Sequence, residues 1–267
     1  MNKIKLRDIN LMALQKLKHQ GTKATLYKSG DTCFKILDGL TDEEKEQLYQ
    51  KFLDMDVIEL DDVLLPRELI MQDGKLQGYT MDYFADAVPL SKAFLVRYVD
   101  CRKLFNYVIK ASKTLRMIHS KDIICQDLSF ENILVNNKGE IAFCDLDGCH
   151  YKEHISPFIS ALMKRFLIDY RDEKIFVSPN LDRISMMISF YYLLYLEEIQ
   201  KLTKKQYHKL SDKIITLENM REYANRLVDR SNPIGEIPYL DELIDITDDC
   251  VFDREKQLSF IKRIFRK

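Results

Sequence analysis

The sequence predicts an α+β fold class, in which a small β-rich lobe precedes a larger, mainly helical lobe. Two observations lead to this prediction. Short β-prone runs separated by turn residues fill residues 22–84, whereas apolar residues recur at helical spacing from residue 94 onward. The character changes near residues 85–91, so we expect one domain built from an N-terminal lobe over residues 1–86 and a C-terminal lobe over residues 87–267.

The composition is typical of a water-soluble protein, with a formal net charge of −1 at neutral pH. The 41 basic and 42 acidic residues nearly cancel, which leaves no global field to attract nucleic acid or an anionic membrane. The polar start is unlike a signal peptide, and the apolar run Ile184–Leu196 is too short to span a bilayer. The six cysteines show no zinc-ligand spacing and indicate reduced thiols. We therefore expect a cytoplasmic protein with no membrane insertion and no nucleic-acid partner.

The N-terminal lobe is expected to be a small antiparallel sheet with one helix. Residues 1–18 have a mixed pattern that suggests a short element packed on this sheet. Gly30-Asp31 and Asp73-Gly74 each separate two β-prone runs and predict two hairpins. Thr41 followed by Glu44 forms a capping-box pattern, which predicts a helix that begins there and ends near Met55.

The C-terminal lobe is expected to begin with a long buried helix from Phe94 to about His119. Two short strands divided by Asn137-Lys138-Gly139 follow it. Helical spacing then predicts five further helices: Ile184–Glu198, Tyr207–Leu217, Met220–Val228, Tyr239–Ile246 and Arg254–Phe265.

The segment between the long helix and the second strand carries the most specific motif. Asp127 is followed five residues later by Asn132 and then by an apolar run, and Asp145 stands at the end of another apolar run. One carboxylate of such a set can accept the proton of an attacking hydroxyl. An amide and a second carboxylate can hold Mg²⁺, a hard ion that prefers oxygen ligands.

This order of motifs resembles the protein-kinase-like superfamily of phosphotransferases, in which D-x-x-x-x-N precedes a strand and D-F-G. The resemblance covers about residues 20–195 and implies a two-lobed kinase-like fold with ATP and Mg²⁺ as cofactors. It assigns Asp127 as the catalytic base that orients the acceptor hydroxyl and accepts its proton, and Asn132 and Asp145 as the metal ligands. It also implies that Asp182 hydrogen-bonds the backbone of the catalytic loop, although an acid there is equally common at a helix N-terminus.

By the same resemblance, Lys35 matches the strand lysine that pairs with the α- and β-phosphates, although a strand lysine taken alone is usually a solvated edge residue. Glu44 would orient this lysine, and Glu46 is the alternative. The remaining nucleotide contacts follow the family's order: Gly21 and Ala24 beside the phosphates, Cys33 and Leu134 around the purine ring, Met81 as gatekeeper, and the backbone of Asp82 and Phe84 at the adenine edge.

Departures from the family leave the function open, the largest being in the glycine-rich loop, where only Gly21 remains of three glycines. Gln126 replaces an arginine that pairs with an activation-loop phosphate, Ser129 replaces a lysine that steadies the γ-phosphate, and Asp147 replaces the glycine of D-F-G. The expected function is phosphoryl transfer from ATP to a hydroxyl of a protein serine or threonine. The alternatives are a small-molecule acceptor, or a pseudokinase that senses nucleotide or binds a protein partner through its helical lobe.

Overall fold

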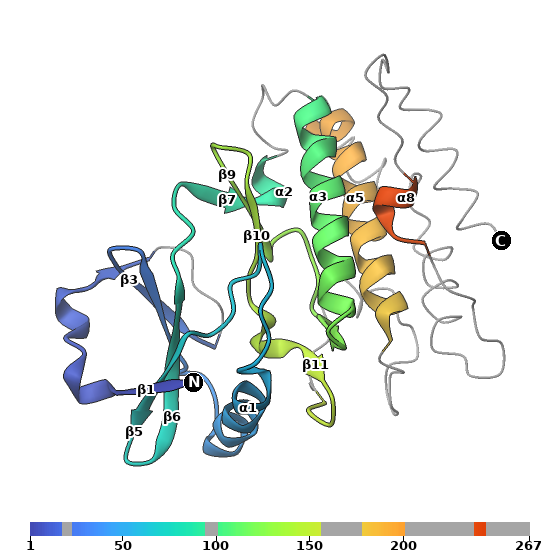
Figure 1. Ribbon diagram of the computed structural model, residues 1–267. Coiled ribbons are helices and arrows are strands. Elements are labelled where there is room, and N and C mark those ends of the chain that lie inside the picture. Colours follow the sequence, from blue (N-terminus) through green and yellow to red (C-terminus); the bar gives the residue numbers. More distant parts are fainter. Residues whose placement is uncertain (18–22, 94–100, 156–177, 201–237, 244–267) are drawn as a thin grey trace. The chain divides into compact units, whose positions relative to one another are not determined.

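The computed structural model describes residues 1–17, 23–93, 101–155, 178–200 and 238–243 (Figure 1). Gly21 and the helices expected over 207–217, 220–228 and 254–265 lie outside the described residues. The chain divides into two compact units. The first contains Met1–Ala87 and Ala142–Asp147, and the second contains Val88–Ile141 and the residues from Gly148 onward. The short segment 142–147 thus belongs with the N-terminal part of the chain, whereas the sequence-based boundary grouped it with the C-terminal part.

The first unit is built on a six-stranded sheet with the order β1-β5-β6-β4-β3-β2. Its strands are β1 (Asn2–Lys5), β2 (Gln15–Lys16), β3 (Thr25–Ser29), β4 (Thr32–Ile36), β5 (Glu68–Gln72) and β6 (Lys75–Asp82). Strand β1 runs parallel to β5, and the other pairs are antiparallel. The sheet is therefore mixed rather than antiparallel, because the N-terminal segment supplies a strand and the long connection to β5 permits a parallel pair. Two 3₁₀ turns, η1 (Leu6–Asp8) and η2 (Leu11–Ala13), separate β1 from β2.

The turns and the helix of this unit form where the sequence predicted them. Gly30 has a φ of 57° between β3 and β4, and Asp73 and Gly74 have φ values of 50° and 80° between β5 and β6. Such left-handed backbone suits the tight turn of a hairpin. Helix α1 (Asp42–Met55) begins at Thr41, whose side chain and that of Glu44 complete a capping box. Both predicted hairpins and the predicted helix are confirmed.

Helix α1 packs against β6 and closes the core of the first unit. Phe52 and Tyr79 meet edge to face with ring centroids 5.0 Å apart, and both side chains are buried. Gly78 on β6 lies opposite Ile36 on β4, and a Cβ at Gly78 would stand only 2.2 Å from the backbone oxygen of Lys35. The absence of a side chain at Gly78 is thus what lets the two strands approach at Lys35.

The second unit is mainly helical. Its elements are α2 (Leu90–Ala93), α3 (Cys101–His119), α5 (Pro179–Gln200), α8 (Leu240–Leu243) and the short strands β7 (Ala87–Pro89), β8 (Ile123–Ile124), β9 (Ile133–Asn136) and β11 (His150–Tyr151). Strand β10 (Ile141–Phe143) and the 3₁₀ turn η3 (Leu146–Gly148) lie where the chain passes between the units. Strand β7 lies beside β9, and β8 pairs antiparallel with β11.

Helices α3 and α5 run side by side, with α8 against both (Figure 1). Phe105 and Phe190 join α3 to α5 edge to face at 5.3 Å. The apolar stripe expected on the long helix is fully buried at Val108, Ala111 and Ile118. The α+β class is confirmed, and among the described residues no helix combines the length and apolarity needed to cross a membrane.

Candidate functional site

Lys35 is the centre of a cluster of charged side chains in the first unit. It lies on β4, an interior strand between β6 and β3, and only 7% of the residue is exposed. Its Nζ atom pairs with a carboxylate oxygen of Asp145 and lies 2.9 Å from Oδ1 of Asp147. Lys35 is therefore not a solvated edge residue, which is the ordinary alternative for a lysine in a strand.

The two acids follow β10, which is joined to the first unit through its backbone. The amide of Phe143 donates to the carbonyl of Asp62 at 2.8 Å, and the amide of Leu64 donates back to Phe143 at 2.8 Å. Directly after this short bridge the chain turns, and Asp145 has a left-handed φ of 65°. A left-handed non-glycine residue is uncommon and costs about 1–3 kcal/mol, so the turn is held by its surroundings.

A second buried lysine completes what we call the charge cluster: Lys35, Lys51, Asp145 and Asp147. Lys51 lies on α1, is 6% exposed, and donates from Nζ to the backbone oxygen of Asp147 at 2.5 Å. Lys35 thus pairs with both carboxylates, while Lys51 contacts the backbone of Asp147, and the formal charges of the four side chains balance. The side chain of Asp145 is 44% exposed, whereas those of Lys35 and Asp147 are largely buried.

The electrostatics favour the charged forms of Lys35 and Asp147, whereas burial raises the pKa of Asp145. Burial lowers the pKa of Lys35, but the nearby charges, that of Asp147 first, outweigh it and hold the pKa well above its ordinary value. Burial raises the pKa of Asp147, but the charge and hydrogen bond of Lys35 outweigh it and leave the pKa below its ordinary value. The Lys35 ammonium also lies 5.6 Å from the centre of the Tyr79 ring. Burial, followed by the charge of Asp147, raises the pKa of Tyr79 well above its ordinary value, so its phenol stays neutral.

Two thiols of the first unit are protonated at neutral pH. Burial raises the pKa of Cys33 to about 11, and burial followed by the charge of Asp145 raises that of Cys144 to about 12. Because the thiolate is the reactive form of cysteine, neither side chain is an activated nucleophile. The chemistry of this region belongs to its oxygen and ammonium groups.

Glu44 does not orient Lys35, and this corrects the sequence-based assignment. One carboxylate oxygen of Glu44 pairs with Lys23 at 3.0 Å, and the other accepts the amide of Thr41 at 2.8 Å in the capping box. The alternative, Glu46, is exposed and accepts a hydrogen bond from Gln50 at 2.8 Å. Glu44 lies in the first turn of α1, where an acidic side chain accepts a hydrogen bond from a free backbone amide and interacts favourably with the helix dipole.

Asp147 is instead an orienting acid of Lys35, a role that the sequence did not suggest. The signal that could have revealed the arrangement lies in α1. Lys51 stands in phase with the buried apolar residues Leu48, Phe52 and Met55, and all four are buried. A lysine on the buried stripe of a helix needs an acceptor from elsewhere in the fold. In this chain that acceptor is the turn at Asp147.

The residues expected around the nucleotide are partly gathered in the first unit. Ala24, Cys33 and Met81 are buried in its core, and Cys33 lies opposite Met81 on neighbouring strands. Asp82 ends β6, with its exposed side chain 2.7 Å from Arg67, and Phe84 follows it half-buried. Leu134 belongs to β9 in the second unit.

Asp127 and Asn132 belong to the second unit, in a loop over residues 125–132 that we call the acid loop. The side-chain amide of Asn132 donates from Nδ2 to the backbone oxygen of Asp127 at 2.9 Å. The backbone amide of Asn132 donates to Ser129 at 3.0 Å. The loop is thus closed on itself, and the amide oxygen Oδ1 of Asn132 is the atom of this side chain with the chemistry of a Mg²⁺ ligand.

Asp182 fixes the start of the acid loop, as the sequence predicted. Its Oδ2 accepts the backbone amide of Cys125 at 2.6 Å, and its Oδ1 accepts that of Gln126 at 2.9 Å. The carboxylate is fully buried. Gln126, the residue directly before Asp127, has a left-handed φ of 58°. The two hydrogen bonds therefore hold a backbone conformation that a non-glycine residue rarely adopts.

Neither protein-family models nor curated proteins match this chain.

Proposed function

We propose that this protein is an ATP- and Mg²⁺-dependent phosphotransferase with a two-lobed, protein-kinase-like fold. It transfers the γ-phosphoryl group to a hydroxyl, with a protein serine or threonine as the favoured acceptor. The observation that carries the proposal is Lys35, a buried lysine on an interior strand, paired with two acids that follow a second strand. This is the arrangement expected of a lysine that holds phosphates next to a metal-binding acid.

Stability alone is a weak explanation for the charge cluster. A buried ion pair contributes little or nothing compared with apolar residues of the same volume, because removing the charges from water offsets their attraction. Lys35 and Lys51 are each surrounded by residues of an apolar core that could have accommodated such a replacement. The presence of buried charges that add little or nothing to stability supports a role for the charge cluster in binding a charged ligand.

Each proposed role follows from the chemistry of the side chain. Lys35 would exchange its carboxylate partners for phosphate oxygens, and the resemblance implies Asp145 and Asn132 as the residues that would hold the metal. Mg²⁺, when bound, supplies neutralisation of the phosphate charge. Asp127 would orient the acceptor hydroxyl and accept its proton. The donor set fits the ion, because two oxygen atoms from an acid and an amide suit a hard cation that keeps several of its waters.

Phosphoryl transfer is tested by incubating the purified protein with γ-labelled ATP and Mg²⁺, with added protein and small-molecule acceptors. Asp127→Asn and Asp145→Asn are compared with two matched controls. Asp122 is an exposed acid in the second unit and Asp86 an exposed acid in the first, and both, like Asp145, have a left-handed φ. We expect label transfer or hydrolysis that both site variants abolish and both controls retain. Turnover that survives either site variant would contradict the assignment.

A pseudokinase is the second candidate, and one observation favours it. The lysine and the acids already neutralise one another, so the first unit is electrostatically complete without a ligand. Such a protein would bind nucleotide or a protein partner, the latter through its helical unit, without turnover. Nucleotide binding with no label transfer to any acceptor would select this candidate, and no nucleotide binding would remove both.

A further inference from the structure

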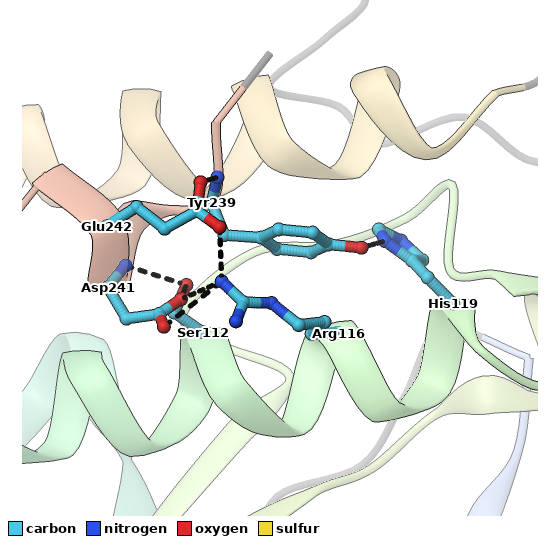
Figure 2. A network of polar contacts seen from close by, with 6 residues as sticks. All are labelled: Ser112, Arg116, His119, Tyr239, Asp241 and Glu242. Carbon is cyan, nitrogen blue, oxygen red and sulfur yellow. Dashed lines mark hydrogen bonds and ion pairs between the residues drawn. The ribbon is translucent and has the colours of Figure 1, made fainter. Parts of the chain in front are cut away.

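A short helical segment near the C-terminal end of the described residues is fastened to α3 by polar contacts (Figure 2). Asp241 accepts a hydrogen bond from Ser112 at 2.7 Å, and its own amide donates back to the Ser112 hydroxyl at 3.0 Å. Arg116 pairs with Asp241 at 3.2 Å and with Glu242 at 2.7 Å. Glu242 also accepts a hydrogen bond from the backbone amide of Tyr239 at 3.0 Å, which gives this amide at the start of the segment an acceptor.

These contacts aim Tyr239 at His119, the last residue of α3. Tyr239 is 8% exposed, and the guanidinium carbons of Arg116 and Arg183 lie 4.6 and 3.9 Å from its ring centroid. Its hydroxyl lies 2.8 Å from Nδ1 of His119, as Figure 2 shows. A phenol whose ring is fixed by two cations has little freedom to turn away from this partner.

The other ring nitrogen of His119 contacts Asp182, the residue that holds the start of the acid loop. Nε2 of His119 lies 3.0 Å from Oδ2 of Asp182, the same oxygen that accepts the amide of Cys125. Because a carboxylate can only accept, Nε2 must carry a proton. In the neutral ring Nδ1 is then an acceptor, and the Tyr239 hydroxyl is the donor that it meets.

We propose that Tyr239 is a positioning residue for the loop that carries Asp127. It acts through His119 and Asp182, which in turn holds the amides of Cys125 and Gln126. The tyrosine keeps the imidazole in the orientation and tautomer that donate to Asp182, and Asp182 keeps the left-handed backbone at Gln126. The catalytic meaning of this relay rests on the proposed function, whereas the relay itself can be measured without turnover.

The test removes only the hydroxyl, in Tyr239→Phe, and follows the acid loop by hydrogen exchange of a peptide that contains Cys125 and Gln126. We expect exchange at these amides to accelerate roughly tenfold, the size of effect that follows the loss of one buried hydrogen bond. Tyr49→Phe is the matched control, because it removes an exposed hydroxyl that accepts from Lys3 in the first unit. Unchanged exchange in Tyr239→Phe, or an equal acceleration in Tyr49→Phe, would overturn the relay.

Two further measurements keep the proposal testable if Tyr239→Phe folds poorly. Nitrogen-15 spectra of histidine in the unaltered protein must show a proton on Nε2 of His119, and a neutral ring protonated on Nδ1 overturns the proposal with no variant needed. In a His119→Gln background, Tyr239→Phe should add nothing to the exchange of the acid loop. Independent, additive effects of the two changes would contradict a relay through His119.

Measuring phosphoryl transfer by the unaltered protein and by Tyr239→Phe distinguishes a failure of the relay from a failure of the proposed function. If the protein transfers phosphoryl groups, Tyr239→Phe should lower kcat and leave the KM for ATP unchanged, because Tyr239 touches neither ligand. If the unaltered protein transfers none while the loop responds as expected, the proposed function fails and the relay stands. Full activity in Tyr239→Phe would refute the positioning role.

Discussion

The charge cluster of the first unit and the Asp182 anchor of the second are both built around buried charge, but they satisfy it in different ways. Asp182 is fully buried, and it accepts from two backbone amides and one imidazole. In the charge cluster, the partners of Lys35 are two side chains, one of which is 44% exposed. Backbone partners cannot leave without a change of fold, whereas an exposed carboxylate can turn toward a ligand.

This difference indicates which of the two regions does chemistry. The Asp182 anchor is a scaffold, because every contact described for it fixes a chain segment. The charge cluster can exchange partners, because a phosphate oxygen can replace a carboxylate oxygen at Lys35 with little loss of electrostatic energy.

Asp182→Ala should be the most destabilising change. It leaves the amides of Cys125 and Gln126 buried without their acceptor, and it releases the left-handed residue before Asp127. We expect a loss of about 3–5 kcal/mol in the free energy of unfolding, measured by urea denaturation. The control, Asp61→Ala, removes an exposed acid. A loss below about 1 kcal/mol, the level of a surface substitution, would mean that Asp182 is not the anchor of the loop.

Lys35→Met should destabilise the protein less, by about 2 kcal/mol, because Lys51 and solvent still screen the two acids. Adding Asp147→Leu should recover part of this loss, since the two changes together remove a buried pair rather than leave one charge alone. Lys45→Met is the control, because Lys45 is a helix lysine that donates to the neutral side chain of Gln77. Strictly additive losses in the double variant would show that Lys35 and Asp147 do not interact.

Asp147 should make the protein sensitive to acid. The folded pKa of Asp147 lies below its ordinary value of 3.8, so the unfolded chain binds this proton first as the pH falls. Its contribution is therefore complete above the ordinary pKa and is lost as the pH falls through the folded pKa. Urea denaturation between about pH 6 and 2.5 should show a steeper loss in the unaltered protein than in Asp147→Asn. Parallel curves would mean that Asp147 has the same pKa in both states.

Glu44→Gln should have the smallest effect, because it touches only the end of α1. We expect a loss of about 0.5–1 kcal/mol in unfolding free energy, the size of a helix-cap contribution, and no change in nucleotide affinity. Glu46→Gln serves as the control on the same helix. A fall in ATP affinity with Glu44→Gln would return this residue to the nucleotide site and weaken the role given to Asp147.

The local features of the fold could be predicted because each has a short-range cause. Gly30 and Gly74 mark turns, Thr41 begins a helix, and the spacing of the apolar residues of α3 marks its buried face. The parallel pairing of β1 with β5 could not be predicted, because it joins segments far apart in the chain whose own patterns are neutral. Tertiary packing decided that pair, as it often does for strands.

The candidate site was predictable in part for the same reason. Asp182 and Lys35 were identified by their place in an ordered series of motifs, and their contacts now have a physical account. Asp147 was missed as a partner of Lys35 because the family pattern led to an acid on the helix, whereas this acid lies in the turn after β10. Tyr239 was missed because only the packing of α8 on α3 brings it to His119.

Calorimetric titration with ATP, in the presence and absence of Mg²⁺, tests most directly whether the charge cluster exchanges its partners for a ligand. We expect Mg²⁺-dependent binding that weakens at least about tenfold in Lys35→Met, because one charge-assisted contact to a phosphate is worth roughly 1.5–3 kcal/mol. Asp145→Asn should abolish the dependence on Mg²⁺, and Lys45→Met should leave both quantities unchanged. Absence of binding by the unaltered protein, or equal binding by Lys35→Met, would contradict the central claim.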